Sequence, residues 1–292
     1  MRRSHLKNIS LIIPTYYRYD YLKQILRLVK EQTLVPHEVI IVDQTPLEDR
    51  PENFYTEYKK LHKDLKIFYL DQPSAPNARN FGAKKASGEI LLIIDDDIIF
   101  NKDFVESHLK IMNEENVDVV NGATTLNEAL PNKYPWEIQT MDPVRYFLGA
   151  PNYKWEGMML SVSSCNFSIK REIYLKSGGF DIFAPRMQDF EFGFRLFRNG
   201  AKIFYSYKPK ARHLRGEGGL RKNPIKFDRL VGAIYLHKKH FPGWISFQFQ
   251  LKYIFGHLFD KWNVKTLPKI FFRCFSLFII RKKADALLGK SH

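Results

Sequence analysis

Three consecutive carboxylates interrupt an apolar stretch of the sequence. The run "LLIIDDDIIF" covers residues 91–100 and places Asp95, Asp96 and Asp97 after four apolar residues. Charged side chains are seldom buried without partners, so a strand that carries them must end there or meet positive charge. Two aspartates spaced as Asp-x-Asp at the end of a buried strand offer oxygen ligands that suit Mg²⁺ or Mn²⁺. The sequence therefore predicts a divalent-metal site here, and an acid cluster that merely ends the strand is the alternative.

The segments around these acids alternate between strand and helix patterns. Four apolar runs rich in β-branched residues predict buried parallel strands, at residues 9–16, 37–45, 65–72 and 89–94. Helices are predicted at residues 20–32, with Asp20 placed to cap the start, and at residues 77–87. This order predicts a doubly wound α/β sheet, in which ligands bind beyond the carboxyl ends of the strands. Asp43 lies at one such end, and the run Asp95, Asp96 and Asp97 lies at another.

The second half of the sequence has a looser pattern. Prolines and aromatic residues predict an irregular segment between residues 122 and 157. Later segments predict a strand, a helix and a glycine-marked turn at 163–181, a helix at 188–200, a strand at 201–207 and a basic loop at 208–219. Such a mobile basic loop could close over a diphosphate. Residues 225–292 combine helical spacing with aromatic residues and cations, which predicts a C-terminal helical appendage.

Composition limits the class of protein. The 292 residues are 45% hydrophobic and 26% charged, as in a folded globular chain. The formal net charge of +15 favours anionic partners such as nucleotides, phosphorylated substrates, nucleic acid or an acidic membrane surface. Two distant cysteines argue against a disulfide framework or a structural zinc site. The first apolar run is too short for a signal peptide, and Arg273 interrupts the longest one, so we expect a cytoplasmic chain without a transmembrane helix.

The order of the motifs resembles glycosyltransferase family 2, the inverting nucleotide-sugar enzymes. "SLIIPTYYR" is similar to the opening strand of that family, and "IIVDQT" to its nucleotide-contacting strand end. "NARNFGAKKASGEILLIIDDD" resembles its helix, Gly-Glu turn and Asp-x-Asp, and "CNFSIKREIYLKSGGFDIFAPRMQDFEFGFRLFRNG" its acceptor-side block. The resemblance covers residues 10–219. It implies a GT-A fold, an α/β architecture with a mostly parallel central sheet and helices on both faces, over residues 1–220. The donor half would cover about 8–122 and the acceptor half about 123–220, followed by a basic, aromatic-rich helical region at 221–292.

The same resemblance implies roles for residues on the donor side. Asp43 would accept a hydrogen bond from the donor's base, and Asp97 would bind the metal directly. Asp95 would face the ribose or a metal-bound water, as part of the metal site, and Asp96 beside it is a further substrate-binding candidate. The remaining donor-side candidates are Pro14, Thr15, Tyr16 and Arg18 after the first strand, Arg79 near the nucleotide or diphosphate, and Arg215 in the basic loop. An ordinary surface turn around Thr15 and a salt bridge at Arg79 are the alternatives.

On the acceptor side, Asp189 resembles the general base that takes the proton from the attacking acceptor hydroxyl. Single displacement needs only one such base, so inversion follows. Gln188 stands where the family usually has Glu, and Glu191 is expected to interact on another face of the helix. Asn166 is a further substrate-binding candidate. His213 is similar to a third metal ligand, and a loop histidine among cations is the alternative.

The implied activity is a metal-dependent, hexosyl-type transfer with Mn²⁺ or Mg²⁺. The donor would be a UDP-, GDP- or dTDP-sugar and the acceptor a saccharide or lipid-linked saccharide, in bacterial surface polysaccharide synthesis. Lys265, Lys269 and Arg273 recur at helical spacing beside phenylalanines, a pattern typical of a helix on an anionic membrane surface. We therefore expect peripheral contact with the inner face of the cell membrane, with packing on the core as the alternative.

Two other functions compete with this interpretation. A nucleotidyltransferase shares the strand-end acids, but it should carry a phosphate loop rich in glycine and lysine after its first strand, and residues 15–19 lack one. A basic nucleic-acid- or membrane-binding module, with purely structural acids, would fit the +15 charge. That module leaves the order of the motifs unexplained, so no nucleic-acid partner is expected.

Overall fold

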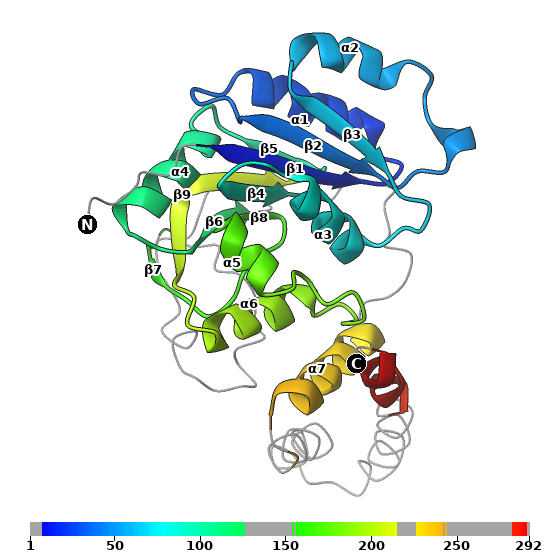
Figure 1. Ribbon diagram of the computed structural model, residues 1–292, viewed down its shortest axis with the longest axis vertical. Helices are drawn as coiled ribbons and strands as arrows, with labels where there is room; N and C mark the ends of the chain where they lie inside the picture. Colours follow the sequence, from blue (N-terminus) through cyan, green and yellow to red (C-terminus); the bar gives the residue numbers. More distant parts are fainter. Residues whose placement is uncertain are drawn as a thin grey trace, which may run out of the picture. The chain divides into compact units, whose positions relative to one another are not determined.

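The computed structural model describes residues 8–125, 154, 156–214, 226–241, 243 and 282–290. Within these residues, helices cover both faces of a nine-stranded sheet (Figure 1). The strands are β1 (Ile9–Thr15), β2 (Glu38–Asp43), β3 (Leu65–Tyr69), β4 (Ile90–Ile94), β5 (Ile98–Phe100), β6 (Val119–Thr125), β7 (Glu156–Met158), β8 (Asn166–Lys170) and β9 (Ile203–His213). The helices are α1 (Tyr19–Lys30), α2 (Phe54–Leu61), α3 (Ala75–Lys85), α4 (Phe104–Glu114), α5 (Arg171–Lys176), α6 (Gln188–Arg198) and α7 (Lys226–His240), and residues 282–290 form a further helix.

The sheet has the strand order β3-β2-β1-β4-β8-β6-β9-β5, and β7 pairs with β9. The four strands from β3 to β4 are parallel, as the continuous apolar runs predict. Beyond β4 the sheet is mixed, because β8 runs antiparallel to both β4 and β6. The predicted parallel arrangement therefore holds for the half of the sheet that ends in the acids.

Two apolar layers enclose this sheet. Residues of β1 alternate between them: Leu11 and Ile13 belong to the layer under α1, α2 and α4, whereas Ile12 belongs to the layer under α3, α5 and α6. Every residue of β1, β2 and β4 is buried. Burial on both faces fixes the carboxyl ends of these strands, and hence the side chains that follow them.

Two predicted helices differ in detail from the observed ones. The helix α1 begins at Tyr19 after Arg18, which occupies the N-cap position without a side-chain cap bond, so the predicted cap by Asp20 is wrong. Asp20 lies in the first turn, where a negative charge complements the helix dipole. The helix α3 starts two residues earlier than predicted, and its Gly82 permits close contact with the sheet, since a Cβ there would lie 2.6 Å from Cγ2 of Ile12.

The strand β9 replaces the first part of the predicted basic loop. It continues to His213, so residues 208–213 are strand, and Arg215 with the rest of that loop lies outside the described residues. The pairing of β9 with β5 explains the difference, because Ile98, Ile99 and Phe100 supply an antiparallel partner for this basic stretch. Long-range pairing of this kind overrides the local loop signal.

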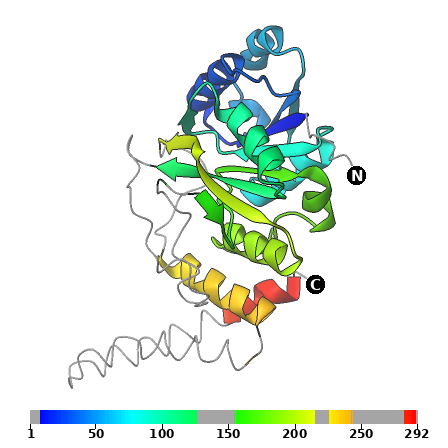
Figure 2. The ribbon, with the colours of Figure 1, turned by 90° about the vertical axis from the view of Figure 1, so that its left-hand side faces the viewer.

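The chain divides into two compact units. The first comprises Met1–Phe180 and Phe192–Lys222, and the second comprises Asp181–Glu191 and Asn223–His292. This division departs from the predicted boundary at residue 220, because Asp181–Glu191 groups with the C-terminal region. In the second unit, α7 and the helix 282–290 lie side by side (Figures 1 and 2) and share an apolar cluster that includes Val231, Ile234 and Ala284.

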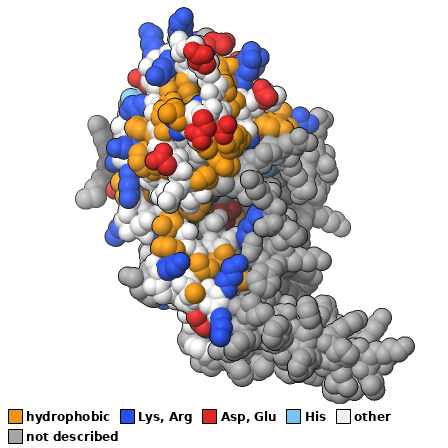
Figure 3. All heavy atoms as spheres, turned by 90° about the vertical axis from the view of Figure 1, so that its right-hand side faces the viewer, with side chains coloured by type: hydrophobic (Ala, Val, Ile, Leu, Met, Phe, Trp, Pro, Cys, Tyr) orange, Lys and Arg blue, Asp and Glu red, His pale blue; other side chains and the backbone are white. Residues whose placement is uncertain are grey.

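Surface features bear on the predicted partners. Lysine and arginine side chains on the described part of the face in Figure 3 are interspersed with acidic and apolar ones rather than gathered in one basic stripe. Among the described residues, no helix combines the length and apolar character that a membrane crossing needs. Lys265, Lys269 and Arg273, which carry the predicted membrane contact, lie outside the described residues.

A candidate metal and nucleotide site

Strand pairing brings His213 to the acidic turn. The strand β4 ends at Ile94, the three aspartates form a turn, and β5 starts at Ile98, which pairs with His213 of β9. The backbone N–H of Leu214 donates to the carbonyl of Asp97 at 2.8 Å, which fixes the end of β9 against the turn. Residues more than 110 positions apart in the sequence thus meet at one edge of the sheet.

In Asp95 and in Asp97, one carboxylate oxygen contacts an arginine and the other lies near His213. Asp95 Oδ1 accepts from Arg79 Nη2 at 2.8 Å, and Asp95 Oδ2 lies 3.6 Å from His213 Nε2. Asp97 Oδ2 lies 3.0 Å from Arg18 Nη1, and Asp97 Oδ1 lies 3.5 Å from the same His213 nitrogen. One ligand atom from each of Asp95, Asp97 and His213 lies within 4.8 Å of the others. Each carboxylate is therefore anchored by an arginine and turns its second oxygen toward a shared centre.

The charges at this centre favour a cation. The three carboxylates carry one more negative charge than Arg18 and Arg79 offset, while the Asp97 side chain is 0% exposed. Burial by itself raises the pKa of Asp95, but the hydrogen bond with His213 and the charge of Arg79 hold that pKa well below its usual range. Two carboxylate oxygens and an imidazole nitrogen are suitable ligands for Mn²⁺ or Mg²⁺. The described residues thus fit a divalent cation held by Asp95, Asp97 and His213.

Asp96 has different surroundings from its two neighbours. Its Oδ1 accepts from Arg18 Nη1 at 2.9 Å, and its Oδ2 accepts from Thr15 Oγ1 at 2.8 Å. Burial raises the pKa of Asp96 to about 6, although Arg18 and Thr15 act in the opposite direction. Arg18 therefore joins Asp96 to Asp97, and Asp96 ties the turn to the end of β1.

Asp43 lies at the end of β2 beneath two tyrosines. The carboxylate is fully buried, and its Oδ2 accepts hydrogen bonds at 2.8 Å from the hydroxyls of Tyr19 on α1 and Tyr55 on α2. Its Oδ1 accepts from the backbone N–H of Thr45 at 2.9 Å. Burial, together with the negative charge of Asp43, raises the pKa of Tyr55 far above its usual value. Both phenols therefore remain protonated donors to Asp43.

Exposed aromatic rings lie at the carboxyl ends of β1 and β3, the two strands that flank β2. Tyr17 and Tyr69 are among the exposed large side chains, and the guanidinium of Arg50 lies 3.9 Å from the centre of the Tyr69 ring. Tyr17 has a φ of 57°, a left-handed conformation that is rare for an aromatic residue. Its N–H donates to Thr45 Oγ1 at 3.0 Å, and its hydroxyl donates to Asp49. Strained backbone and exposed aromatic rings at the carboxyl ends of strands are features of a ligand site.

Asp189 lies in the first turn of α6 and is half-buried. Gln188, which stands where glycosyltransferase family 2 usually has Glu, begins the helix and precedes Asp189. Glu191 is fully buried, and its Oε1 lies 3.0 Å from His240 Nε2 and 3.2 Å from Lys239 Nζ. The interaction of Glu191 on another face of the helix was predicted, and Lys239 and His240 of α7 supply it.

Asn166 is part of a buried polar network. Its Nδ2 donates to the carbonyls of Ala123 and Pro209 at 2.9 and 2.8 Å, and its Oδ1 lies 2.9 Å from His108 Nε2. Burial lowers the pKa of His108 to about 4, so this imidazole is neutral near pH 7. These contacts tie β8 to β6, β9 and α4, whereas the predicted contact of Asn166 with substrate stays a prediction.

The structure brings most of the predicted donor-side residues together and adds others. Arg18, Arg79, Thr15 and His213 all contact the acidic turn, although for Arg79 the contact shown is the salt bridge foreseen as an alternative. Pro14 is buried in β1 opposite Val42, and Tyr16 is half-buried after that strand. Sequence reasoning missed Tyr19, Tyr55 and His108. The helical spacing of Phe54, Tyr58 and Leu61 was the available signal for α2, which carries Tyr55.

Comparison with known proteins finds relatives that are named as glycosyltransferases or as polysaccharide biosynthesis proteins. An uncharacterised glycosyltransferase of Rickettsia conorii is 35% identical over 108 residues, which cover 37% of this chain and 18% of that relative. An O-antigen biosynthesis protein of Myxococcus xanthus is 26% identical over 223 residues, which cover 70% of this chain and 17% of that protein. The matched part of this chain thus spans less than a fifth of the length of either relative.

A solved structure supports the fold. The crystal structure of GalNAc-T7 with UDP, GalNAc and Mn²⁺ matches with a TM-score of 0.64 and 15% identity, over 91% of this chain and 54% of that one. This confirms the predicted GT-A fold, with a mixed sheet and helices on both sides. The sequence model described as "Glycosyl transferase family 2" matches residues 10–178, more than half of the chain. The protein therefore belongs to glycosyltransferase family 2.

Proposed function

We propose that this protein is an inverting, metal-dependent glycosyltransferase that moves a hexosyl group from a nucleotide sugar to a saccharide or lipid-linked saccharide. The observation that carries the proposal is the convergence of Asp95, Asp97 and His213 at the end of β4, beside two arginines. The name of the Myxococcus xanthus relative supports a place in surface polysaccharide synthesis. Family membership favours this function over a nucleotidyltransferase or a binding module without catalysis.

The metal would be Mn²⁺ or Mg²⁺, held by Asp95 Oδ2, Asp97 Oδ1 and His213 Nε2. When bound, it would supply positive charge to the diphosphate of the donor as that leaving group departs. Arg18 and Arg79 have a separate task, since each fixes one carboxylate oxygen and leaves the other directed at the centre. The Mn²⁺ that accompanies UDP in the GalNAc-T7 crystal structure supports this choice of ion.

The donor's nucleotide would bind at the carboxyl ends of β1 and β2. Asp43 would accept a hydrogen bond from the base, and its fully buried carboxylate already accepts hydrogen bonds from the hydroxyls of Tyr19 and Tyr55, which would line the same place. The exposed rings of Tyr17 and Tyr69 offer stacking surfaces for the base or ribose. A UDP-, GDP- or dTDP-sugar would suit this site.

Asp189 would act as the general base. A half-buried carboxylate in the first turn of a helix can accept the proton of the acceptor hydroxyl as that oxygen forms its bond to the anomeric carbon. The bond from that carbon to the diphosphate breaks in the same displacement, so the product has the inverted configuration. Asn166 and Arg215 would contact substrate, and the C-terminal region would contact the inner face of the cell membrane.

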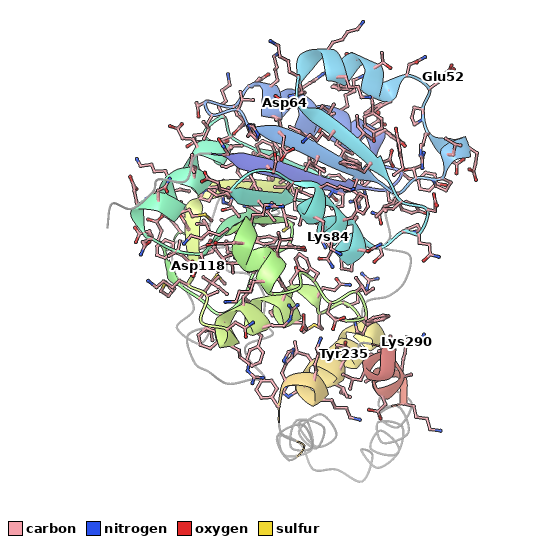
Figure 4. The ribbon with its side chains drawn as sticks, in the orientation of Figure 1. Glu52, Asp64, Lys84, Asp118, Tyr235 and Lys290 are labelled. Carbon is pink, nitrogen blue, oxygen red and sulfur yellow. The ribbon has the colours of Figure 1, made fainter. Side chains whose placement is uncertain are left out.

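A donor panel tests the proposal. UDP-, GDP- and dTDP-sugars are incubated with Mn²⁺ and the wild type, Asp97→Ala or Asp64→Ala, and release of the nucleoside diphosphate is measured. Asp64 is an exposed acid just before β3 (Figure 4), so Asp64→Ala removes the same group away from the turn. We expect metal-dependent release by the wild type and Asp64→Ala, and loss in Asp97→Ala. Release by Asp97→Ala at the wild-type rate, or no release from any donor, would contradict the proposed function.

Asp189→Asn separates the base from the donor site. This variant should bind the donor with wild-type affinity, because asparagine keeps the size and shape of the side chain and Asp189 is not among the residues proposed to hold the donor. Transfer to an acceptor should be lost, because an amide cannot take the proton. Retained turnover would show that another residue is the base.

A further inference from the structure

Residues Asp181–Glu191 form a segment that carries Asp189 and groups with the C-terminal region. We call it the base segment, since the inference below rests on the proposed role of Asp189. The helix α7 contacts this segment over more than two turns. A Cβ built on Gly232 would lie 2.0 Å from the carbonyl oxygen of Pro185 and 2.5 Å from Cγ of Met187. The backbone of α7 therefore lies directly against the middle of the base segment, where only glycine fits.

Apolar contacts continue this interface. Ala184 of the base segment belongs to one buried cluster with Val231, Ile234 and Tyr235 of α7, to which Ala284 of the helix 282–290 also belongs. All five residues are almost completely buried. The C-terminal helices thus supply the apolar support on which this part of the base segment packs.

Polar contacts join both ends of the segment to α7. Tyr235, labelled in Figure 4, donates its hydroxyl to Asp181 Oδ2 at 2.5 Å. Lys239 Nζ lies 2.5 Å from the same Asp181 oxygen and 3.2 Å from Glu191 Oε1. His240 Nε2 lies 3.0 Å from that Glu191 oxygen. Lys239 therefore bridges the first and the last residue of the base segment with a single ammonium group.

We infer that Lys239 is a positioning residue for transfer, which holds the two ends of the base segment and so fixes Asp189 between them. The Asp181 and Glu191 side chains are only 6% and 0% exposed, so each carboxylate depends on protein cations and donors for compensation. One cation shared by two buried carboxylates gives the segment one favoured arrangement. The C-terminal helical region is then a support of the acceptor side rather than a separate appendage.

The neighbouring lysine provides a matched control. Lys238 lies on α7 beside Lys239, but it pairs with Asp285 of the helix 282–290 and not with the base segment. Lys239→Met and Lys238→Met therefore remove the same charge from adjacent positions, while Lys239→Arg keeps the charge. Gly232→Ala disturbs the same interface without changing any charge.

Hydrogen exchange of the full chain tests the inference without relying on activity. In Lys239→Met and Gly232→Ala we expect the amides of residues 181–191 to exchange about tenfold faster, with β1 and β4 unchanged. Lys238→Met should match the wild type, and Lys239→Arg should restore most of the protection. Unchanged exchange in Lys239→Met, or an equal increase in Lys238→Met, would overturn the inference. Faster exchange throughout β1 and β4 would also overturn it, because it would indicate a general loss of stability.

Kinetics add a second readout. In Lys239→Met we expect kcat for transfer to fall about 10- to 100-fold, because a base displaced by about 1 Å loses that much rate. The dissociation constant of the nucleoside diphosphate with Mn²⁺ should stay within about twofold of the wild type. A parallel loss of donor affinity would overturn the positioning role. If the wild type transfers no sugar but the amides of residues 181–191 exchange faster in Lys239→Met, only the proposed function is refuted. If the wild type is active but exchange in Lys239→Met is unchanged, only this inference is refuted.

Discussion

Arg18→Met tests whether the acidic turn is built for a cation. Arg18 Nη1 lies 2.9 Å from Asp96 Oδ1 and 3.0 Å from Asp97 Oδ2, so one guanidinium serves two buried carboxylates. Methionine keeps the length and apolar character of the side chain and removes its charge. Because Arg18 lowers the pKa of Asp96, that pKa is higher in Arg18→Met, and the comparison is made at a pH high enough to keep Asp96 ionised. Under that condition the excess of negative charge at the turn rises from one to two. We expect a protein that is less stable alone and binds Mn²⁺ more tightly.

The magnitude follows from burial and Coulomb's law. Removing one partner of a buried ion pair costs about 3–5 kcal/mol, because the remaining carboxylates lose their compensation. For a chain of this size that loss lowers the Tm by about 10 °C. A unit charge about 6 Å from the cation, at an effective dielectric constant of about 20, contributes about 3 kcal/mol of repulsion, and more for a divalent ion. Allowing for screening, the affinity for Mn²⁺ should rise at least about tenfold.

Thermal unfolding at increasing Mn²⁺ concentration measures both effects. The Tm of Arg18→Met should start below that of the wild type and rise more steeply with Mn²⁺, because ligand binding to the folded state adds stability. Lys23→Met, an exposed position on α1, is the control for a lost cation and should follow the wild type. An unchanged Tm for both the wild type and Arg18→Met at millimolar Mn²⁺ would refute the metal site. A smaller Mn²⁺ effect in Arg18→Met than in the wild type would refute the electrostatic argument.

Three further substitutions test buried polar groups of the sheet, one at the amino end of β2 and two closer to the site. Glu38 is buried and accepts from Ser10, Ser87 and Lys66; burial by itself raises its pKa, but these bonds lower it to about 2 from an ordinary value near 4.5. Its stabilising effect is therefore present above pH 4.5 and is lost as the pH falls toward 2. A shift of this size corresponds to about 3 kcal/mol of folding free energy, which we reduce to about 1–2 kcal/mol because the partner Lys66 is 45% exposed. In urea unfolding, Glu38→Gln should therefore be less stable than the wild type at pH 7 and equally stable near pH 2. Tyr55→Phe removes a donor from the buried Asp43 and should cost about 1–3 kcal/mol in urea unfolding; wild-type stability would show that Tyr19 alone suffices. Asn166→Leu leaves two carbonyls and His108 without their partner and should cost about 3 kcal/mol in the same assay, whereas a loss below about 1 kcal/mol would contradict its role as a tie between strands.

The parts of the fold that the sequence predicted share one property: their signal is local. The strands β1, β2 and β4 are buried on both faces, so each is a continuous apolar run that can be recognised without knowing its neighbours. The helix α3 was also predicted, although its start was placed two residues late; Ser74 at its N-cap and Pro76 in its first turn are the local signals that mark the observed start. Asp43 and Asp95 could be singled out as candidate residues because Asp43 ends β2 and Asp95 directly follows β4.

The parts that the sequence did not predict depend on distant partners. The strand β5 has only three residues and exists because β9 pairs with it. Residues 208–213 are basic and resemble a loop locally, yet alternate side chains point inward once β5 is beside them. The role of Tyr55 depends on where α2 lies relative to β2, and the grouping of Asp181–Glu191 depends on α7. For β5 with β9 and for residues 181–191 with α7, the two partners lie far apart in the sequence. Asp43 and Tyr55 are 12 positions apart, but the sequence between them does not fix how α2 packs on β2.

The three aspartates show how much of a metal site can be predicted from residue type and spacing alone. Asp95 and Asp97, two positions apart, both face His213, whereas Asp96 between them bonds Thr15 and Arg18. The spacing of two predicts that the outer pair shares a face, as side chains do along an extended chain. It cannot tell on which side a metal would bind, because that depends on β9 bringing His213 to one side and on Arg18, which follows β1, lying on the other. A metal site of this kind is therefore specified by its strand pairing as much as by its ligands, and disrupting the β5–β9 ladder should weaken Mn²⁺ binding even with both carboxylates intact.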